Sequence, residues 1–172
     1  MGHSFTAATI YLSLLSYLLA VVCWVTERRG TSYRWLWTVG CIFLWAHAVC
    51  GFHFYHGWSH SAAVEETARQ TEAVLGWRFG VGIWFSYGLL VVWSIDVLMA
   101  WTVRGWTEQA RNYWGAAVHI YAFFILFNGT VVFEQGVIRW AGIIGTIWVA
   151  RLAWRFRKRP ALQVDHVKIV ND

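Results

Sequence analysis

Five runs of mostly apolar residues occupy most of this chain, and each is long enough to cross a membrane as a helix. A spanning helix needs about 20 apolar residues, and a helix satisfies its own backbone hydrogen bonds in lipid, where water cannot. The sequence therefore predicts an all-α integral membrane protein, a bundle of about five transmembrane helices. The expected spans are Thr6–Val25, Trp35–Phe54, Val81–Val103, Trp114–Phe133 and Val137–Trp154.

The composition supports a lipid environment. Only 13% of the 172 residues are charged and 58% are hydrophobic, whereas soluble domains carry about 25% charged residues. The net charge of +5 sits in short loops and at the C-terminal end, so we read it as a signal for membrane orientation and expect no nucleic-acid partner. We expect a single transmembrane domain over residues 1–160, followed by a basic cytoplasmic tail over residues 161–172.

Lysine and arginine are concentrated in alternate loops, and short loops rich in these residues face the cytoplasm. Eleven of them fall on one side of the expected bundle and three on the other. The N-terminus is therefore expected outside and the C-terminus in the cytoplasm. The larger set is Arg28, Arg29, Arg34, Arg104, Arg111, Arg151, Arg155, Arg157, Lys158, Arg159 and Lys168, and the smaller set is Arg69, Arg78 and Arg139.

Tryptophans gather near the ends of the expected spans, where their amphipathic rings favour the membrane interface. We expect Trp24, Trp35, Trp37, Trp101, Trp106, Trp114 and Trp154 to form a belt on the cytoplasmic side, and Trp58, Trp77 and Trp140 to mark the outer boundary.

The only sizeable segment outside the expected spans is predicted to contain a short amphipathic helix, Ser61–Leu75, on the outer side. Ser61 is a suitable N-cap, Glu65 and Arg69 have the spacing of a helical ion pair, and Gly76 is a suitable terminator.

A histidine cluster at the outer end of the second span suggests a metal site. If the helix continues through Trp58, His53, His56 and His60 lie on one face. Imidazole is the commonest metal ligand, and three histidines with a carboxylate or water suit zinc or copper. The carboxylates that could complete the site are Glu65, Glu66 and Glu134. The alternatives are that the histidines are packing residues at the interface, or that Gly57 ends the helix before His60.

Several polar side chains fall within the expected spans. Asp96 and His119 are expected at the same depth near the cytoplasmic side, and buried ionisable residues usually have partners. Such a pair could relay protons, bind a quinone headgroup or serve as a structural clasp. His47 and Asn128 are expected in the outer half. Haem b is less favoured as a cofactor because His47 and His119 do not match in depth.

Three functions remain open. The leading one is a metal-binding membrane protein. The second is an accessory or anchor subunit of a larger membrane complex of respiratory or photosynthetic type, and the third is a small proton-coupled transporter. No phosphate loop, nucleophile elbow or HExxH motif is present, so an enzyme is less expected. Gly142, Thr146 and Ala150 form a stripe of small residues that could pack within the chain, in self-association or against another membrane subunit.

The distribution of basic residues makes a testable prediction about topology. An enzymatic reporter that works only in the cytoplasm should be active when fused after Asp172 and inactive when fused before His3. Activity at both ends would mean an even number of spans and would contradict the five-span arrangement.

Overall fold

The computed structural model describes residues 2–26, 30–109, 113–133 and 136–157, and the regular structure in these ranges is helical throughout. Five helices are long and apolar enough to cross a membrane, which agrees with the expected number. Their main elements are α1 (Gly2–Val25), α2 (Thr31–Gly51), α4 (Ile83–Thr102), α6 (Tyr113–Phe127) and α7 (Val137–Arg157), and short turns extend α2, α4 and α6 to the length of a span. The shorter elements are the π-helical turn η1 (Phe52–His56), α3 (His60–Leu75), the 3-10 turn η2 (Gly80–Gly82), α5 (Trp106–Gln109) and the π-helical turn η3 (Asn128–Val132). The expected tail lies outside the described residues.

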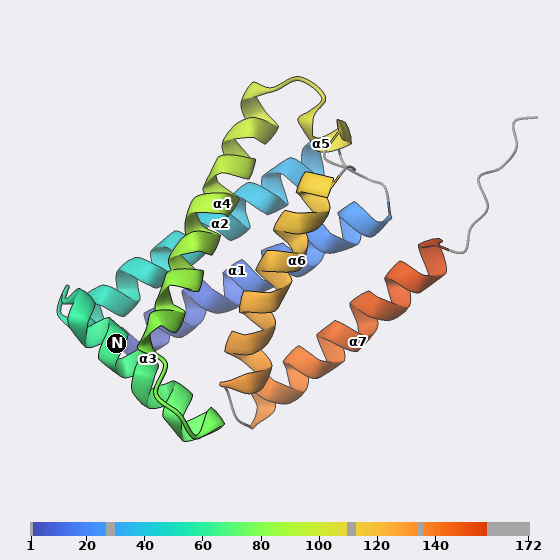
Figure 1. The fold of residues 1–172 in the computed structure, drawn as a ribbon. Coiled ribbons are helices and arrows are strands. Elements are labelled where there is room, and N and C mark those ends of the chain that lie inside the picture. The colour runs from blue at the N-terminus through green and yellow to red at the C-terminus, as the bar shows by residue number, and fades with distance from the viewer. Residues whose placement is uncertain (1, 27–29, 110–112, 134–135, 158–172) are drawn as a thin grey trace, which may run out of the picture.

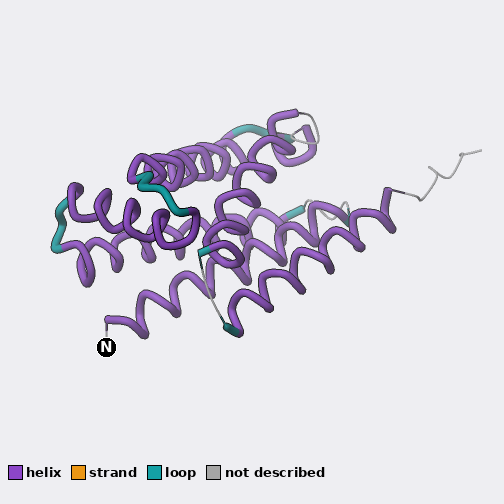
Figure 2. The backbone as a smooth tube through the Cα atoms, turned by 60° about the horizontal axis from the view of Figure 1, so that its bottom comes forward, coloured by secondary structure: helices purple, strands orange, loops and turns teal. Residues whose placement is uncertain are grey.

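Successive long helices run in opposite directions, so the bundle has two ends (Figure 1). We call one the α3 end, where α3 packs against η2, and the other the α5 end, where α5 follows α4. The helices α1, α2, α4 and α6 supply the buried core. Figures 1 and 2 show α7 at the edge of the bundle, where it packs along α1 and η3.

The helix boundaries differ from the expected ones at the α3 end. Helix α2 continues through η1 to His56, but Gly57 and Trp58 have positive φ angles of 53° and 62° and turn the chain. The expected cap was wrong: Ser59, not Ser61, caps α3 by accepting a hydrogen bond from the Ala62 amide at 3.3 Å. After the turn at Gly57, the cap lies two residues earlier than expected and α3 begins at His60, one residue before the expected start.

The expected Glu65–Arg69 pair was also wrong. Arg69 binds Glu66 at 2.7 Å, whereas Glu65 pairs with Arg78. Arg78 also contacts Glu72 at 2.9 Å. The chain between α3 and η2 folds back and brings Arg78 over α3, so two of the helix's carboxylates find a partner outside the helix.

Tryptophans hold the core together. Trp37 and Trp93 are fully buried, with ring centroids 4.5 Å apart, and the Trp93 indole donates to the Trp37 carbonyl at 3.1 Å. The expected place of Trp37 in an interfacial belt was therefore wrong. In lipid the hydrophobic effect does not drive helices together, so close packing and hydrogen bonds between helices stabilise the bundle. A second bond of this kind joins the Ser13 hydroxyl of α1 to the Gly40 carbonyl of α2 at 2.9 Å.

One member of the small-residue stripe on α7 packs within the chain. A Cβ atom on Gly142 would lie 2.9 Å from both the Thr130 hydroxyl oxygen and a Val131 methyl group of η3. The Thr146 hydroxyl donates to the Gly142 carbonyl at 2.9 Å, and Ala150 is exposed. The close approach to η3 thus requires glycine at position 142. Self-association through this stripe stays a prediction.

This close approach predicts the effect of a larger side chain. Gly142→Leu should separate α7 from η3 and lower the stability of the detergent-solubilised protein by about 1–3 kcal/mol, the usual cost of overpacking. Gly145→Ala is the matched control, because the nearest atom to a Cβ there is a Leu18 methyl at 4.0 Å. Equal melting temperatures for the two variants would contradict this packing of α7.

Candidate functional site

The carboxylate of Asp96 is buried in the bundle and accepts hydrogen bonds from three tryptophans. The Trp37 indole donates to Oδ2 at 2.9 Å, and those of Trp106 and Trp114 donate to Oδ1 at 3.0 and 2.9 Å. A buried carboxylate is costly unless it is hydrogen-bonded, and the indole N–H is a donor only. The three indole donors replace hydrogen bonds that water would otherwise donate to the Asp96 carboxylate.

These four residues, the Asp96 cluster, connect separate elements. Asp96 lies on α4, Trp37 on α2, Trp106 on α5 and Trp114 at the start of α6. The cluster therefore joins the segment between α4 and α6 to the core at the α5 end. The sequence predicts a partner for Asp96 but not these tryptophans, whose positions near span ends are typical of the membrane interface. Trp106 and Trp114 lie 10 and 18 residues after Asp96, on the short connection to the next span and at the start of that span, and this spacing is the one signal in the sequence for their contact.

His119 lies beside this cluster and is enclosed by aromatic rings from α1 and α2. The rings of Trp24 and Trp37 lie 4.8 and 4.7 Å from its imidazole. Its Nε2 atom is 3.2 Å from the Tyr33 hydroxyl, and the Tyr17 hydroxyl donates to the His119 carbonyl at 3.2 Å. The structure thus brings Asp96 and His119 to one layer, where Trp37 contacts both.

The three histidines at the α3 end have different surroundings. His53 is exposed beside Phe54, His56 is half-buried beside Phe52, and His60 begins α3, where its Nδ1 atom lies 3.1 Å from the Tyr87 hydroxyl. The helix that would align them ends at His56. The condition on which the predicted stripe depended is therefore not met.

The carboxylates proposed as further ligands have other partners or lie outside the described residues. Glu65 pairs with Arg78, Glu66 pairs with Arg69, and Glu134 lies outside the described residues. Within the described ranges, no group of three or more His, Cys, Asp or Glu side chains is placed to hold a metal ion. Binding of zinc or copper stays a prediction from the sequence.

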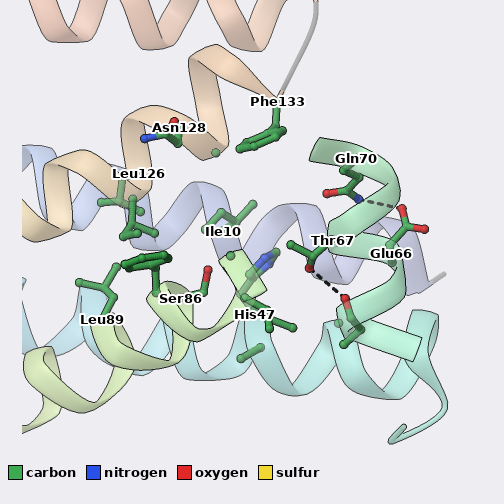
Figure 3. Close-up of a pocket in the computed structure, with 18 of the residues that line it drawn as sticks. Ile10, His47, Glu66, Thr67, Gln70, Ser86, Leu89, Leu126, Asn128 and Phe133 are labelled. Atoms are coloured by element: carbon green, nitrogen blue, oxygen red, sulfur yellow. Dashed lines mark hydrogen bonds between the residues drawn. The ribbon is translucent and has the colours of Figure 1, made fainter. Parts of the chain in front are cut away.

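The half of the bundle next to α3 contains a cavity of about 790 Å³, which we call the α3 cavity (Figure 3). Apolar side chains of four spans form most of its wall, among them Ile10, Leu44, Leu89 and Leu126. Polar side chains also face it, and they come from several elements. They include His47 from α2, Glu66, Thr67 and Gln70 from α3, Ser86 from α4 and Asn128 from η3.

The charged groups of the α3 cavity neutralise each other. Arg69 binds the Glu66 carboxylate through Nε at 2.9 Å and Nη2 at 2.7 Å, and Gln70 donates to it at 2.8 Å. The hydrogen bond from Arg69 holds the pKa of Glu66 below its usual range, so the carboxylate stays ionised at neutral pH. The pair is solvated enough that its contribution to stability is small.

Two polar residues predicted for the outer half do line the α3 cavity. His47 places Nδ1 3.0 Å from the Thr6 carbonyl, and Asn128 donates through its amide to the Phe124 carbonyl at 2.7 Å. The sequence pattern missed Ser86, Thr67 and Gln70, because a cavity between helices brings together residues that share no local motif. No protein-family model, curated protein or solved structure matches this chain.

The Asp96 cluster predicts a coupling between its members. Asp96→Ala and Trp114→Phe should each destabilise the solubilised protein, and the double variant should cost less than their sum, because both changes remove the same bond. A hydrogen bond to a charged group contributes about 1.5–3 kcal/mol. The control is Trp101→Phe, whose indole donates to Thr38 at 2.9 Å instead. A Trp101 variant coupled to Asp96 as strongly as Trp114 would contradict the specific role of this bond.

Proposed function

We propose that this chain is a multi-pass membrane protein, with its N-terminus outside and its C-terminus in the cytoplasm, that binds a small hydrophobic molecule in the α3 cavity. The observation that carries the proposal is the cavity itself. Its volume of about 790 Å³ lies within the range of roughly 300–1,000 Å³ that is usual for small-molecule sites. Mostly apolar walls with a few polar groups are also usual for such sites.

The position of the cavity favours a ligand that arrives from the membrane. Its walls come from the helices that are long and apolar enough to span a bilayer, and α3, which is not among them, supplies polar residues on one side. A molecule with an apolar body and a polar end would match this distribution. The cavity also lies apart from the Asp96 cluster, whose residues do not line it.

A second candidate function, an accessory subunit of a larger membrane complex, is favoured by one observation. Helix α7 packs on one side only, and it exposes Trp140, Ile144 and Trp148. Such a face suits either lipid or a neighbouring subunit. Subunits that remain bound through purification and are lost on substitution of Trp148 would support this candidate. The proton-coupled transporter gains no comparable support, because Asp96 is held by three indole donors within a packed core.

Filling the α3 cavity should prevent binding. Ser86→Phe adds a ring on a residue that lines the cavity, so it should reduce occupancy several-fold. The probe is a short-chain alcohol with a photoreactive diazirine beside its hydroxyl group. In lipid nanodiscs it should label peptides of α2, α3 and α4 in the wild-type protein.

Ile95→Phe is the matched control, because Ile95 lies on the same helix and is 45% exposed on the outside of the bundle. It should leave the labelling unchanged. Labelling that is the same in both variants, or that occurs only on the lipid-facing surface, would contradict the proposed function. Melting temperatures of both variants check that they are folded.

A further inference from the structure

The α3 cavity adjoins a second hollow between α1, α6 and α7. This hollow, the α7 groove, has a volume of about 330 Å³. The residues that line both spaces are Tyr11, Leu14, Leu126, Thr130 and Ile138. Because five residues form walls of both, the cavity and the groove lie directly side by side, within reach of one elongated molecule.

The α7 groove suits a hydrocarbon chain. Along α7 its lining runs from Val137 to Val149, about 18 Å at the helical rise of about 1.5 Å per residue. Two of its hydroxyl groups are already bonded to their own helical turns: Thr130 to the Leu126 carbonyl at 2.8 Å and Thr146 to the Gly142 carbonyl at 2.9 Å. The Tyr17 hydroxyl points to the His119 carbonyl at 3.2 Å. The groove therefore offers mainly apolar surface.

The charges around the two spaces disfavour a charged headgroup. Glu66 and Arg69 are the only Asp, Glu, Lys or Arg side chains among the described residues that line either space. They bind each other through two hydrogen bonds. No excess charge of either sign is left to offset a phosphate, carboxylate or ammonium group, and burying such a group unpaired is costly.

Neutral hydrogen-bonding groups remain for a polar head. The Ser86 hydroxyl lines the cavity and makes no hydrogen bond with the part of the chain that the structure describes. Asn128 uses its amide nitrogen on Phe124, so its side-chain carbonyl oxygen is left as an acceptor. Figure 3 shows both residues at the wall of the cavity, from opposite sides.

We propose that the ligand is a single-chain lipid with an uncharged, hydrogen-bonding head, placed with the head in the α3 cavity beside Ser86 and Asn128 and the chain in the α7 groove. This proposal rests on the proposed function and deepens it, because it names the class of ligand and the path of its chain. It commits to one molecule that fills both spaces.

The test uses a long-chain fatty alcohol with a diazirine at the far end of its chain, on the full-length protein in nanodiscs. In the wild-type protein this probe should label the groove-lining parts of α1 and α7. Gly145→Phe places a ring in the groove that Gly145 lines, and the nearest atom to a Cβ at this position is a Leu18 methyl at 4.0 Å. It should weaken competition by the unlabelled long-chain alcohol by about tenfold, the loss expected when roughly two buried methylene groups are displaced.

The control is Ile144→Phe, the neighbouring residue, which is 65% exposed and does not line the groove. It should leave both the labelling and the competition unchanged. The short-chain probe should label the α3 cavity of Gly145→Phe as it labels the wild-type protein. If Gly145→Phe lowers the melting temperature, Gly145→Ala replaces it as the test variant, because it adds only a methyl group to the groove wall.

The charge of the headgroup is tested by competition with a fatty acid and an alkylamine of the same chain length. Both should compete several-fold less well than the alcohol. Equal competition by either charged lipid would overturn the uncharged head. Groove labelling that Gly145→Phe does not change would overturn the path of the chain, while cavity labelling by the short-chain probe would leave the proposed function standing. Failure of the short-chain probe to label the cavity would overturn the proposed function instead.

Discussion

The rest of the structure depends on how a carboxylate is accommodated inside an apolar bundle. Asp96 is only 4% exposed, and an unpaired charge at such a position would be strongly unfavourable. The indole groups of Trp37, Trp106 and Trp114 supply three donors from three different elements. Each bond that stabilises the carboxylate also fixes one helix relative to α4, so the cost of burying Asp96 is linked directly to the arrangement of the α5 end.

The two ends of the bundle consequently differ in packing and in what they can do. At the α5 end, Trp37, Trp93 and His119 fill the space between α1, α2, α4 and α6. At the α3 end the same helices line a partly open cavity of about 790 Å³, to which α3 also contributes. The aromatic side chains therefore pack at one end of the bundle, while the space for a ligand lies at the other.

The sequence predicted the number of long helices because a span has a minimum length and a simple composition. It also predicted one depth for Asp96 and His119, since depth follows from position along a helix, and in the structure both side chains contact Trp37. It failed where the outcome depends on side-chain direction or on a local break. Trp37 lies near the end of a span, as an interfacial tryptophan would, yet its ring points inward. A helix break at Gly57 was one of two alternatives to the predicted histidine stripe, and the backbone shows that the chain turns there, before His60. The α3 cavity could not be predicted, because its walls come from helices that are distant in sequence.

The central claim is that the α3 cavity and the α7 groove hold one uncharged single-chain lipid. The most direct measurement is mass spectrometry of the lipids that remain with the wild-type protein after purification from its membrane into nanodiscs. The account predicts a neutral single-chain species that is enriched over the membrane, in an amount close to that of the protein, and depleted in Ser86→Phe. A lipid composition equal to that of nanodiscs without the protein, in both the wild type and the variant, would contradict it.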